Sequence, residues 1–308
     1  MPNSELAPDV VICGNVVRDV TPDGWAPGGT AVYAAAVARG LGRRVGVVTA
    51  APADVVTAGL PPDVAVARAD VAEATSYENV YTPTGRIQYL RAPGSPIPAA
   101  TLPDAWASAS VALLGPVYHE VTPELAARFR GSVGVCAQGF LRRAGPDGRV
   151  GLMPPERWDA LPVLRRAAVL FLSEEDLAGG TRQAVPESWL AAVPVTVLTA
   201  GWRGARVYAG GRWRPVPAIP VEEVDPTGAG DSFAAAFMVA RDEGADPVEA
   251  TRFAAGAASF TVEARGHQSP TPDAVRARMS SEFRVPSSKR TAPGPGSRNQ
   301  EPGTPRCP

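Results

Sequence analysis

Residues 225–231, with the sequence Asp-Pro-Thr-Gly-Ala-Gly-Asp, place an acid beside a glycine-rich turn. The alanine-rich run that follows predicts an amphipathic helix, and Thr227 is placed to cap its first turn. Gly228 and Gly230 remove side chains from that turn, which leaves bare backbone N–H groups at the positive end of the helix dipole. A carboxylate at Asp231 can accept a proton there from a hydroxyl that attacks a phosphate held by the same amides. The stretch therefore predicts an anion site with Asp231 as a general base.

The charge composition argues against nucleic acid and membranes as partners. Thirty Lys and Arg residues against 31 Asp and Glu residues give a net charge of −1, so no basic field would hold a polyanion. The single lysine, Lys289, lies in a stretch rich in Pro, Gly and Ser, which argues against a phosphate-binding or Schiff-base lysine. His119 and His267 are too few for a His-rich metal centre.

The remaining composition is that of a globular protein in a reducing compartment. The hydrophobic content of 45% is typical of a chain with a sizeable core. Cys13, Cys136 and Cys307 are far apart and odd in number, which argues against a disulfide framework. The sequence shows neither the basic start of a signal peptide nor an apolar run long enough to span a membrane. We therefore expect a cytoplasmic protein.

Short β-branched runs alternate with alanine-rich stretches, a pattern that predicts a mainly parallel sheet covered by helices. Residues 14–27 and 71–92 interrupt it with apolar–polar alternation around turn signals, which predicts two hairpins outside the main sheet that form a small β-flap. We expect one domain over residues 1–283 and a disordered tail over 284–308. Strands are predicted at Val10–Cys13, Arg44–Thr49, Val111–Leu114, Val133–Ala137, Ala168–Leu172 and Val195–Thr199, and helices near 29–41, 122–130, 157–166 and 183–192.

The 225–231 stretch resembles the second signature of the ribokinase-like, or PfkB, family of sugar kinases, and the resemblance extends over about residues 10–280. It implies a three-layer α/β/α sandwich with a β-flap as lid. It also implies ATP-dependent transfer of the γ-phosphate to a hydroxyl, with Asp231 as base and Gly228, Ala229 and Gly230 as the anion hole. Residues implied in ATP binding are Thr199, Gly201 and Gly204 in a loop after a strand, Asp225 and Thr227 in the signature, and Ala257 in a helix beside the adenine.

On the acceptor side, residues 27–31 (Pro-Gly-Gly-Thr-Ala) resemble the family's amino-terminal diglycine. Residues 78–81 (Glu-Asn-Val-Tyr), 114–117 with Glu120, and 138–142 (Gln-Gly-Phe-Leu-Arg) are similar to the branch that includes myo-inositol kinases. The resemblance implies a neutral polyol, sugar or cyclitol as the acceptor. The residues implied in holding it are Asp19, Asn15, Gly28, Gly29, Asn79, Gln138 and Arg142.

Several positions depart from the family pattern. Ser173 and Asp176 stand where many members carry Asn-x-x-Glu, so Asp176 is expected to hold Mg²⁺ through a bound water, with one methylene less reach. Cys136 stands where related sequences often have Asp. Because no lysine is expected at the site, charge on the transferred phosphate must come from Mg²⁺, the helix N-terminus or an arginine such as Arg142 or Arg91.

Two other functions stay open. A nucleoside kinase would need an aromatic platform for the base, which Tyr77, Tyr81 or Tyr89 could supply. A non-catalytic ligand-binding pseudokinase would account for the departures at Ser173 and Asp176, although the intact acid of the signature argues against it. The exposed edges of the flap would also allow a homodimer.

Overall fold

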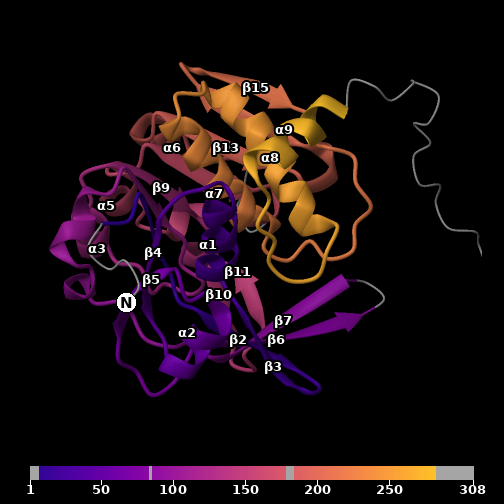
Figure 1. The fold of residues 1–308 in the computed structure, drawn as a ribbon. Helices are drawn as coiled ribbons and strands as arrows, with labels where there is room; N and C mark the ends of the chain where they lie inside the picture. Colours follow the sequence, from indigo (N-terminus) through magenta and orange to yellow (C-terminus); the bar gives the residue numbers. More distant parts are fainter. Residues whose placement is uncertain (1–6, 83–84, 178–183, 282–308) are drawn as a thin grey trace, which may run out of the picture.

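The computed structural model describes residues 7–82, 85–177 and 184–281 (Figure 1). Its main sheet has nine strands in the order β15-β14-β13-β12-β9-β8-β1-β4-β5, and all neighbours from β13 to β5 are parallel. The pairs β13–β14 and β14–β15 are antiparallel and form one edge. The strands are β1 (Val10–Cys13), β4 (Val45–Ala50), β5 (Ala65–Ala69), β8 (Val111–Leu114), β9 (Ser132–Cys136), β12 (Val169–Ser173), β13 (Val195–Thr199), β14 (Ala205–Ala209) and β15 (Arg212–Val216).

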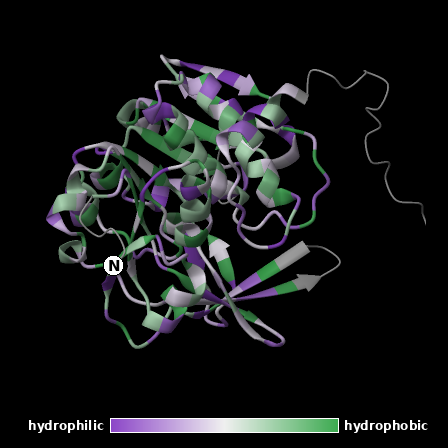
Figure 2. Ribbon diagram, in the orientation of Figure 1, coloured by the Kyte–Doolittle hydropathy of each residue, from purple (hydrophilic) through white to green (hydrophobic). Residues whose placement is uncertain are grey.

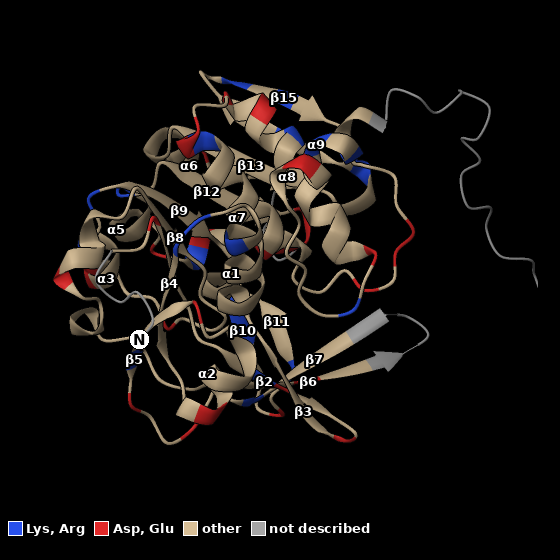
Figure 3. Cartoon of the chain, viewed as in Figure 1, with Lys and Arg blue, Asp and Glu red and all other residues tan. Residues whose placement is uncertain are grey.

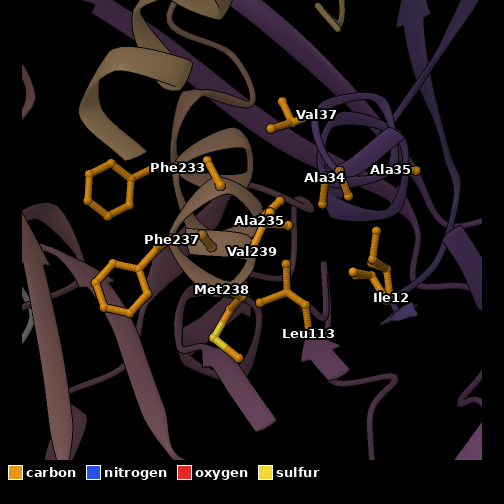
Figure 4. Packing of buried hydrophobic residues seen from close by; sticks show 14 of the residues in the cluster. Ile12, Ala34, Ala35, Val37, Leu113, Phe233, Ala235, Phe237, Met238 and Val239 are labelled. Carbon is orange, nitrogen blue, oxygen red and sulfur yellow. The ribbon is translucent and has the colours of Figure 1, made fainter. Parts of the chain in front are cut away.

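Helices cover both faces of this sheet because alternate strand residues point to opposite sides. In β1, Val10 and Ile12 belong to a core shared with α1 (Thr30–Gly40), α7 (Ala229–Asp242) and α8 (Pro247–Val262). Val11 and Cys13 belong to a second core with α3 (Pro123–Ala127), α5 (Leu161–Leu164) and α6 (Glu187–Ala192). Figure 2 shows the apolar strands between the helix layers, and Figure 4 shows Phe237 and Met238 of α7 in the first core. The predicted three-layer α/β/α sandwich is confirmed.

The two predicted hairpins lie outside the main sheet. They are β2 (Val17–Thr21) with β3 (Gly24–Gly28), and β6 (Ser76–Thr82) with β7 (Gly85–Ala92). Parallel pairing of β2 with β6 joins them into one four-stranded sheet, which we call the flap. The turn residues 83–84 fall outside the described residues. The flap is therefore built from two segments that leave the sandwich separately.

The short helices differ from the expected ranges. The helix predicted near 157–166 begins only at Leu161, because Pro162 lacks an N–H and fits only the first turn of a helix. The helix predicted near 122–130 ends at Ala127, after which the Arg130 N–H donates to Ala107 O. Elements that were not predicted include the edge strand β5, the ribbon of β10 (Arg142–Ala144) and β11 (Val150–Leu152), the 3₁₀ turns η4 (Glu175–Leu177) and η5 (Gly201–Arg203), the short helices α2 (Ala53–Gly59) and α4 (Gln138–Leu141), and α9 (Pro272–Ser281).

Figure 3 shows acidic and basic residues interspersed over the ribbon, in keeping with the near-zero net charge. Within the described ranges, no helix is both long enough and apolar enough to cross a membrane. The predicted tail, residues 284–308, lies outside the described residues.

Candidate active site

The start of α7 has the geometry expected of an anion site, with one correction. Gly228, not Thr227, is the N-cap, with φ at 77°, and no side chain caps this helix end. The Thr227 N–H instead donates to Asp225 Oδ1 at 2.9 Å, which forms the turn that leads into the helix. Gly230 is exposed, and a Cβ built on it would meet nothing within 4 Å, so a ligand can approach the first-turn backbone.

Asp231 occupies the third helical position and is partly buried. Its Oδ1 accepts a hydrogen bond of 2.8 Å from Thr30 Oγ1 at the start of α1. Burial raises the pKa of this carboxyl to about 6, while the Thr30 hydrogen bond and the charge of Arg142 lower the pKa and the charge of Asp176 raises it. Asp231 is thus poised close to neutrality, as a general base should be.

This pKa gives a first prediction. If ionised Asp231 is the base, kcat/KM should fall about tenfold for each pH unit below about 6, because the base form is lost as the pH falls through the pKa. The measurement is a pH profile of kcat/KM from 5 to 8.5 with the pH-dependent ionisation of the donor subtracted. Activity that stayed flat down to pH 5 would contradict the assignment.

Asp176, which is expected from the sequence to hold Mg²⁺ through a water, lies on η4, just after the carboxyl end of β12. Its side chain is 2% exposed; Oδ2 accepts from the Ser173 N–H at 2.7 Å, whereas buried Oδ1 has no hydrogen-bond partner among the described residues. Burial raises the pKa of Asp176. The described ranges contain no cluster of three or more His, Cys, Asp or Glu residues that could hold a metal ion. The single buried carboxylate of Asp176 could contribute to a Mg²⁺ site, because Mg²⁺ commonly takes one or two carboxylates together with waters and substrate phosphates.

Arg142 is the arginine that acts on both acids. Its guanidinium donates to Val117 O at 3.0 Å and to Gln138 Oε1 at 2.9 Å, and lies 5.2 Å from the ring centroid of Tyr77. Its charge lowers the pKa of both Asp231 and Asp176. Arg142 is therefore close enough to Asp231 and Asp176 for its charge to act on both carboxyls, and it also holds the side chain of Gln138.

Arg91, the other arginine proposed from the sequence, is held elsewhere. It pairs with Glu78 at 2.5 Å and lies over the Tyr89 ring at 4.8 Å. Glu78 and Tyr89 are opposite each other in the β6–β7 register and alternate with the buried Tyr77–Leu90 pair. They lie on the outer face of the flap. Arg91 is thus corrected from a candidate phosphate ligand to an outer-face residue.

The flap brings three predicted acceptor residues together. A Cβ on Gly28 would lie 2.1 Å from Asp19 Oδ2, so the carboxylate lies directly over this backbone. Gly29 follows as the N-cap of α1, with φ at 92°. On β6, Asn79 shares the inner face with Tyr77, and its Oδ1 accepts from Gln88 Nε2 at 3.1 Å. Carboxylate, bare backbone and amides thus line one side of the candidate site.

Asn15 requires a correction. Its side chain is fully buried, Nδ2 donates to Thr75 Oγ1 at 3.3 Å and to Ser95 O at 3.0 Å, and Oδ1 accepts from the Ala50 N–H at 2.8 Å. These contacts use both amide hydrogens and the carbonyl oxygen. Asn15 therefore orders the loops at the end of β1 and β4 and has no side-chain surface for a substrate.

The predicted nucleotide loop does follow a strand. Thr199 ends β13, and the Ala200 N–H donates to Gly204 O at 2.8 Å, which closes a tight loop around η5. Gly201 and Gly204 have φ of 55° and 92° there. Ala257 in α8 is instead fully buried in the core, so its methyl group packs on protein and offers no surface to an adenine.

Three residues that the sequence analysis did not assign to the site support it. Glu120, 2% exposed, accepts backbone hydrogen bonds from Asn15 at 2.8 Å and from Val117 at 2.8 Å, which joins the loops after β1 and β8. Thr30 donates a hydrogen bond to Asp231. The Tyr33 ring lies against the backbone of Gly228. Their partners are distant in sequence, so local patterns do not reveal them. The position of Thr30 directly after the diglycine is the one available signal.

Residues 133–274 match the pfkB family carbohydrate kinase. The chain is 49% identical to the ribokinase of Bacillus subtilis (strain 168) over 75 residues, which are 24% of this chain and 26% of the relative. It thus spans about a quarter of that relative's length. The cytidine kinase of Thermococcus kodakarensis is 26% identical over 274 residues, covering 79% of this chain and 92% of the relative.

The fold is also shared with solved structures. A pyrophosphate-dependent kinase in the ribokinase family, complexed with a pyrophosphate analog and myo-inositol, aligns with a TM-score of 0.71 at 22% identity, over 87% of this chain and 99% of that chain. At this identity the likeness establishes the fold. The signature at the start of α7 lies inside the matched residues 133–274. Residues 133–274 therefore match the pfkB family of carbohydrate kinases, and the chain has the ribokinase-like fold.

Proposed function

We propose that this protein is a small-molecule kinase that transfers the terminal phosphoryl group of ATP to a hydroxyl of a neutral sugar or cyclitol. The observation that carries the proposal is the position of Asp231 in the first turn of α7, next to bare amides. Asp231 is also close enough to Arg142 and Asp176 for their charges to change its pKa. This arrangement can hold a phosphate, neutralise charge on it and remove a proton from the attacking hydroxyl.

In the proposed reaction, the acceptor oxygen forms a bond to the terminal phosphorus as the bridging oxygen of the donor departs. The hydroxyl proton passes to Asp231. The amides of Ala229 and Gly230 would hold the phosphoryl oxygens at the helix start, and Arg142 would add a permanent positive charge beside them. Mg²⁺, when bound, would supply further charge neutralisation on the phosphates. Asp176, whose Oδ1 has no hydrogen-bond partner in the described part of the chain, would hold it through water.

The inner face of the flap supports a polyol over a nucleoside. Tyr77 is 2% exposed, its hydroxyl donates to Val117 O at 2.7 Å, and Arg142 covers its ring, so it offers no platform for a base. Tyr89 lies on the outer face, and the side chain of Tyr81 lies outside the described part of the structure. The polar groups on the inner side are the carboxylate of Asp19 and the amide of Asn79, which suit hydroxyl groups.

The loop after β13 supports a nucleotide donor. Trp202 in η5 is 83% exposed, and the Arg203 guanidinium lies 5.9 Å from the centroid of its ring. An exposed indole at this loop gives a nucleobase a flat apolar surface, whereas pyrophosphate has no base to place on it. We therefore propose ATP as the donor, with pyrophosphate as the rival donor to be tested.

The test is a matrix of two donors, ATP and pyrophosphate, against cyclitols, aldoses, ketoses and nucleosides. Phosphorylated product is quantified by mass spectrometry, and the Asp231→Asn variant serves as the inactive control. We expect product with ATP and a cyclitol or sugar, myo-inositol foremost. If only nucleosides were phosphorylated, the acceptor class would be nucleosides and not sugars or cyclitols. If no acceptor were phosphorylated with either donor, the result would favour the non-catalytic binding protein.

A further inference from the structure

Thr30 stands where the acceptor side and the base meet. It is the first residue of α1, directly after Gly28 and Gly29, and its Oγ1 donates a 2.8 Å hydrogen bond to Asp231 Oδ1, a residue 201 positions away. Thr30 is 5% exposed, so water does not compete freely for this bond. The base is thus tied to the helix whose start lies beside the acceptor backbone.

The backbone around Thr30 fixes the direction of its side chain. A Cβ built on Gly115 would lie 2.1 Å from Thr30 Cγ2 and 3.1 Å from Thr30 Oγ1. The threonine methyl group therefore fills the space that the missing side chain of Gly115 leaves. Gly115 itself is held by its N–H, which donates to Cys13 O at 2.8 Å. With the methyl group seated against Gly115, the hydroxyl faces Asp231.

We propose that Thr30 is a positioning residue for the transfer reaction: its hydroxyl fixes Asp231 Oδ1, which leaves Oδ2 as the oxygen that takes the proton of the acceptor. The proposal rests on the proposed function, because it refines the role of the base in that reaction. When one oxygen of a carboxylate is held by a hydrogen bond, the orientation of the carboxylate and the direction of the lone pairs on its other oxygen are fixed. Small losses of alignment at a reacting group reduce the rate strongly.

The same hydrogen bond favours ionised Asp231, because a hydroxyl that donates to a carboxylate stabilises the charged form. Removing it should therefore raise the pKa of Asp231. The charged residues of α8 and its C-cap, Glu249, Arg252 and Glu263, are exposed. The ionisable groups on other elements that interact electrostatically with Asp231 are Arg142 on β10, Asp176 on η4 and Cys136 on β9, and the Tyr33 ring of α1 lies against the backbone of Gly228.

The test compares Thr30→Val, which keeps the shape and loses the hydroxyl, with Thr30→Ser, which keeps the hydroxyl. For Thr30→Val we expect kcat to fall about 10- to 100-fold with little change in KM for either substrate, and the acid limb of kcat/KM to move upward by about half to one pH unit. Thr30→Ser should keep the acid limb near that of the parent protein. Unchanged kcat and acid limb in Thr30→Val would overturn the proposal, as would equal losses in both variants.

Two further measurements keep the proposal independent of folding defects and of the proposed reaction. Gly115→Ala should push the Thr30 side chain from its place and lower kcat, and adding Thr30→Ser should recover part of that loss, because the crowded methyl group is gone. No recovery would overturn the argument from Gly115. Titration of ¹³C-labelled aspartate, assigned by its loss in Asp231→Asn, should show a higher pKa in Thr30→Val. That shift would persist even if no acceptor were ever phosphorylated, in which case the proposed function alone would fail.

Discussion

Asp231→Asn is expected to lower kcat by about 10²- to 10⁴-fold, the usual contribution of a general base. Asparagine keeps the size of the side chain and can still contact Thr30, but it cannot take the proton of the acceptor hydroxyl. Donor binding should persist, because the amides of the first turn are unchanged. The measurements are steady-state turnover and donor affinity by calorimetry, in parallel with the parent protein.

The stability of the same variant provides its control. Because burial raises the pKa of Asp231 in the folded protein to about 6, the protonated form is favoured on folding, and the parent protein loses this stabilisation as the pH rises through that value. Asp231→Asn carries no such charge. Its Tm should therefore exceed that of the parent protein at pH 7.5, and the difference should shrink toward pH 4. Near-normal turnover in a folded variant would place the base elsewhere and leave Asp231 as a first-turn helix residue.

The second large effect is expected at Gly228, where the backbone has φ of 77° and a Cβ would lie 2.1 Å from the Tyr33 ring. In Gly228→Ala the left-handed conformation is strained and the ring must move, so the free energy of unfolding should fall by about 1–3 kcal/mol. The helix start would shift with it, and a displacement of about 1 Å can cost about 10²-fold in rate. Chemical denaturation and turnover measure the two effects.

Gly230→Ala is the matched control, since a Cβ there would meet nothing within 4 Å and the residue is helical. This variant should keep the stability of the parent protein, and any loss should appear in donor affinity alone, because the new methyl group faces the space left for the phosphate. If both substitutions lowered the free energy of unfolding equally, the contact with the Tyr33 ring would not be the reason that residue 228 must be glycine.

Sequence patterns predicted the parts of this fold that local chemistry determines. The strand runs Val10–Cys13, Val111–Leu114 and Val195–Thr199 coincide with β1, β8 and β13, because buried parallel strands require continuous apolar residues. The flap hairpins were also predicted, since alternation and turn residues are local. That the hairpins form one flap was predicted as well, but the parallel pairing of β2 with β6 was not, because it connects residues about 60 positions apart and leaves no local pattern.

For the site, the residues that follow from helix chemistry were predicted well and those that depend on distant partners were not. Asp231 and Gly228 lie at the helix start as the signature indicates. Thr227 was assigned to the N-cap because its hydroxyl is a good cap, but the positive φ of the next residue moves the helix start by one position. Asn15 and Ala257 were assigned by resemblance, and their burial became visible only once the loops and α8 were packed.

The flap rests on a small apolar cluster of its own, in which Val17, Tyr77 and Val117 are packed with Leu90 and Val150. The Leu90 N–H also donates to Gly148 O at 2.8 Å, which connects β7 to the ribbon that begins at Arg142. Any step that lifted the flap from the sandwich would expose this cluster to water, at about 1.5–3 kcal/mol for each large side chain. Hydrating apolar surface raises heat capacity. If flap opening limits product release and exposes the cluster, this change in heat capacity would curve the Eyring plot of kcat. If the flap moved as one body with the β10–β11 ribbon, the cluster would stay out of contact with water and the plot would be straight.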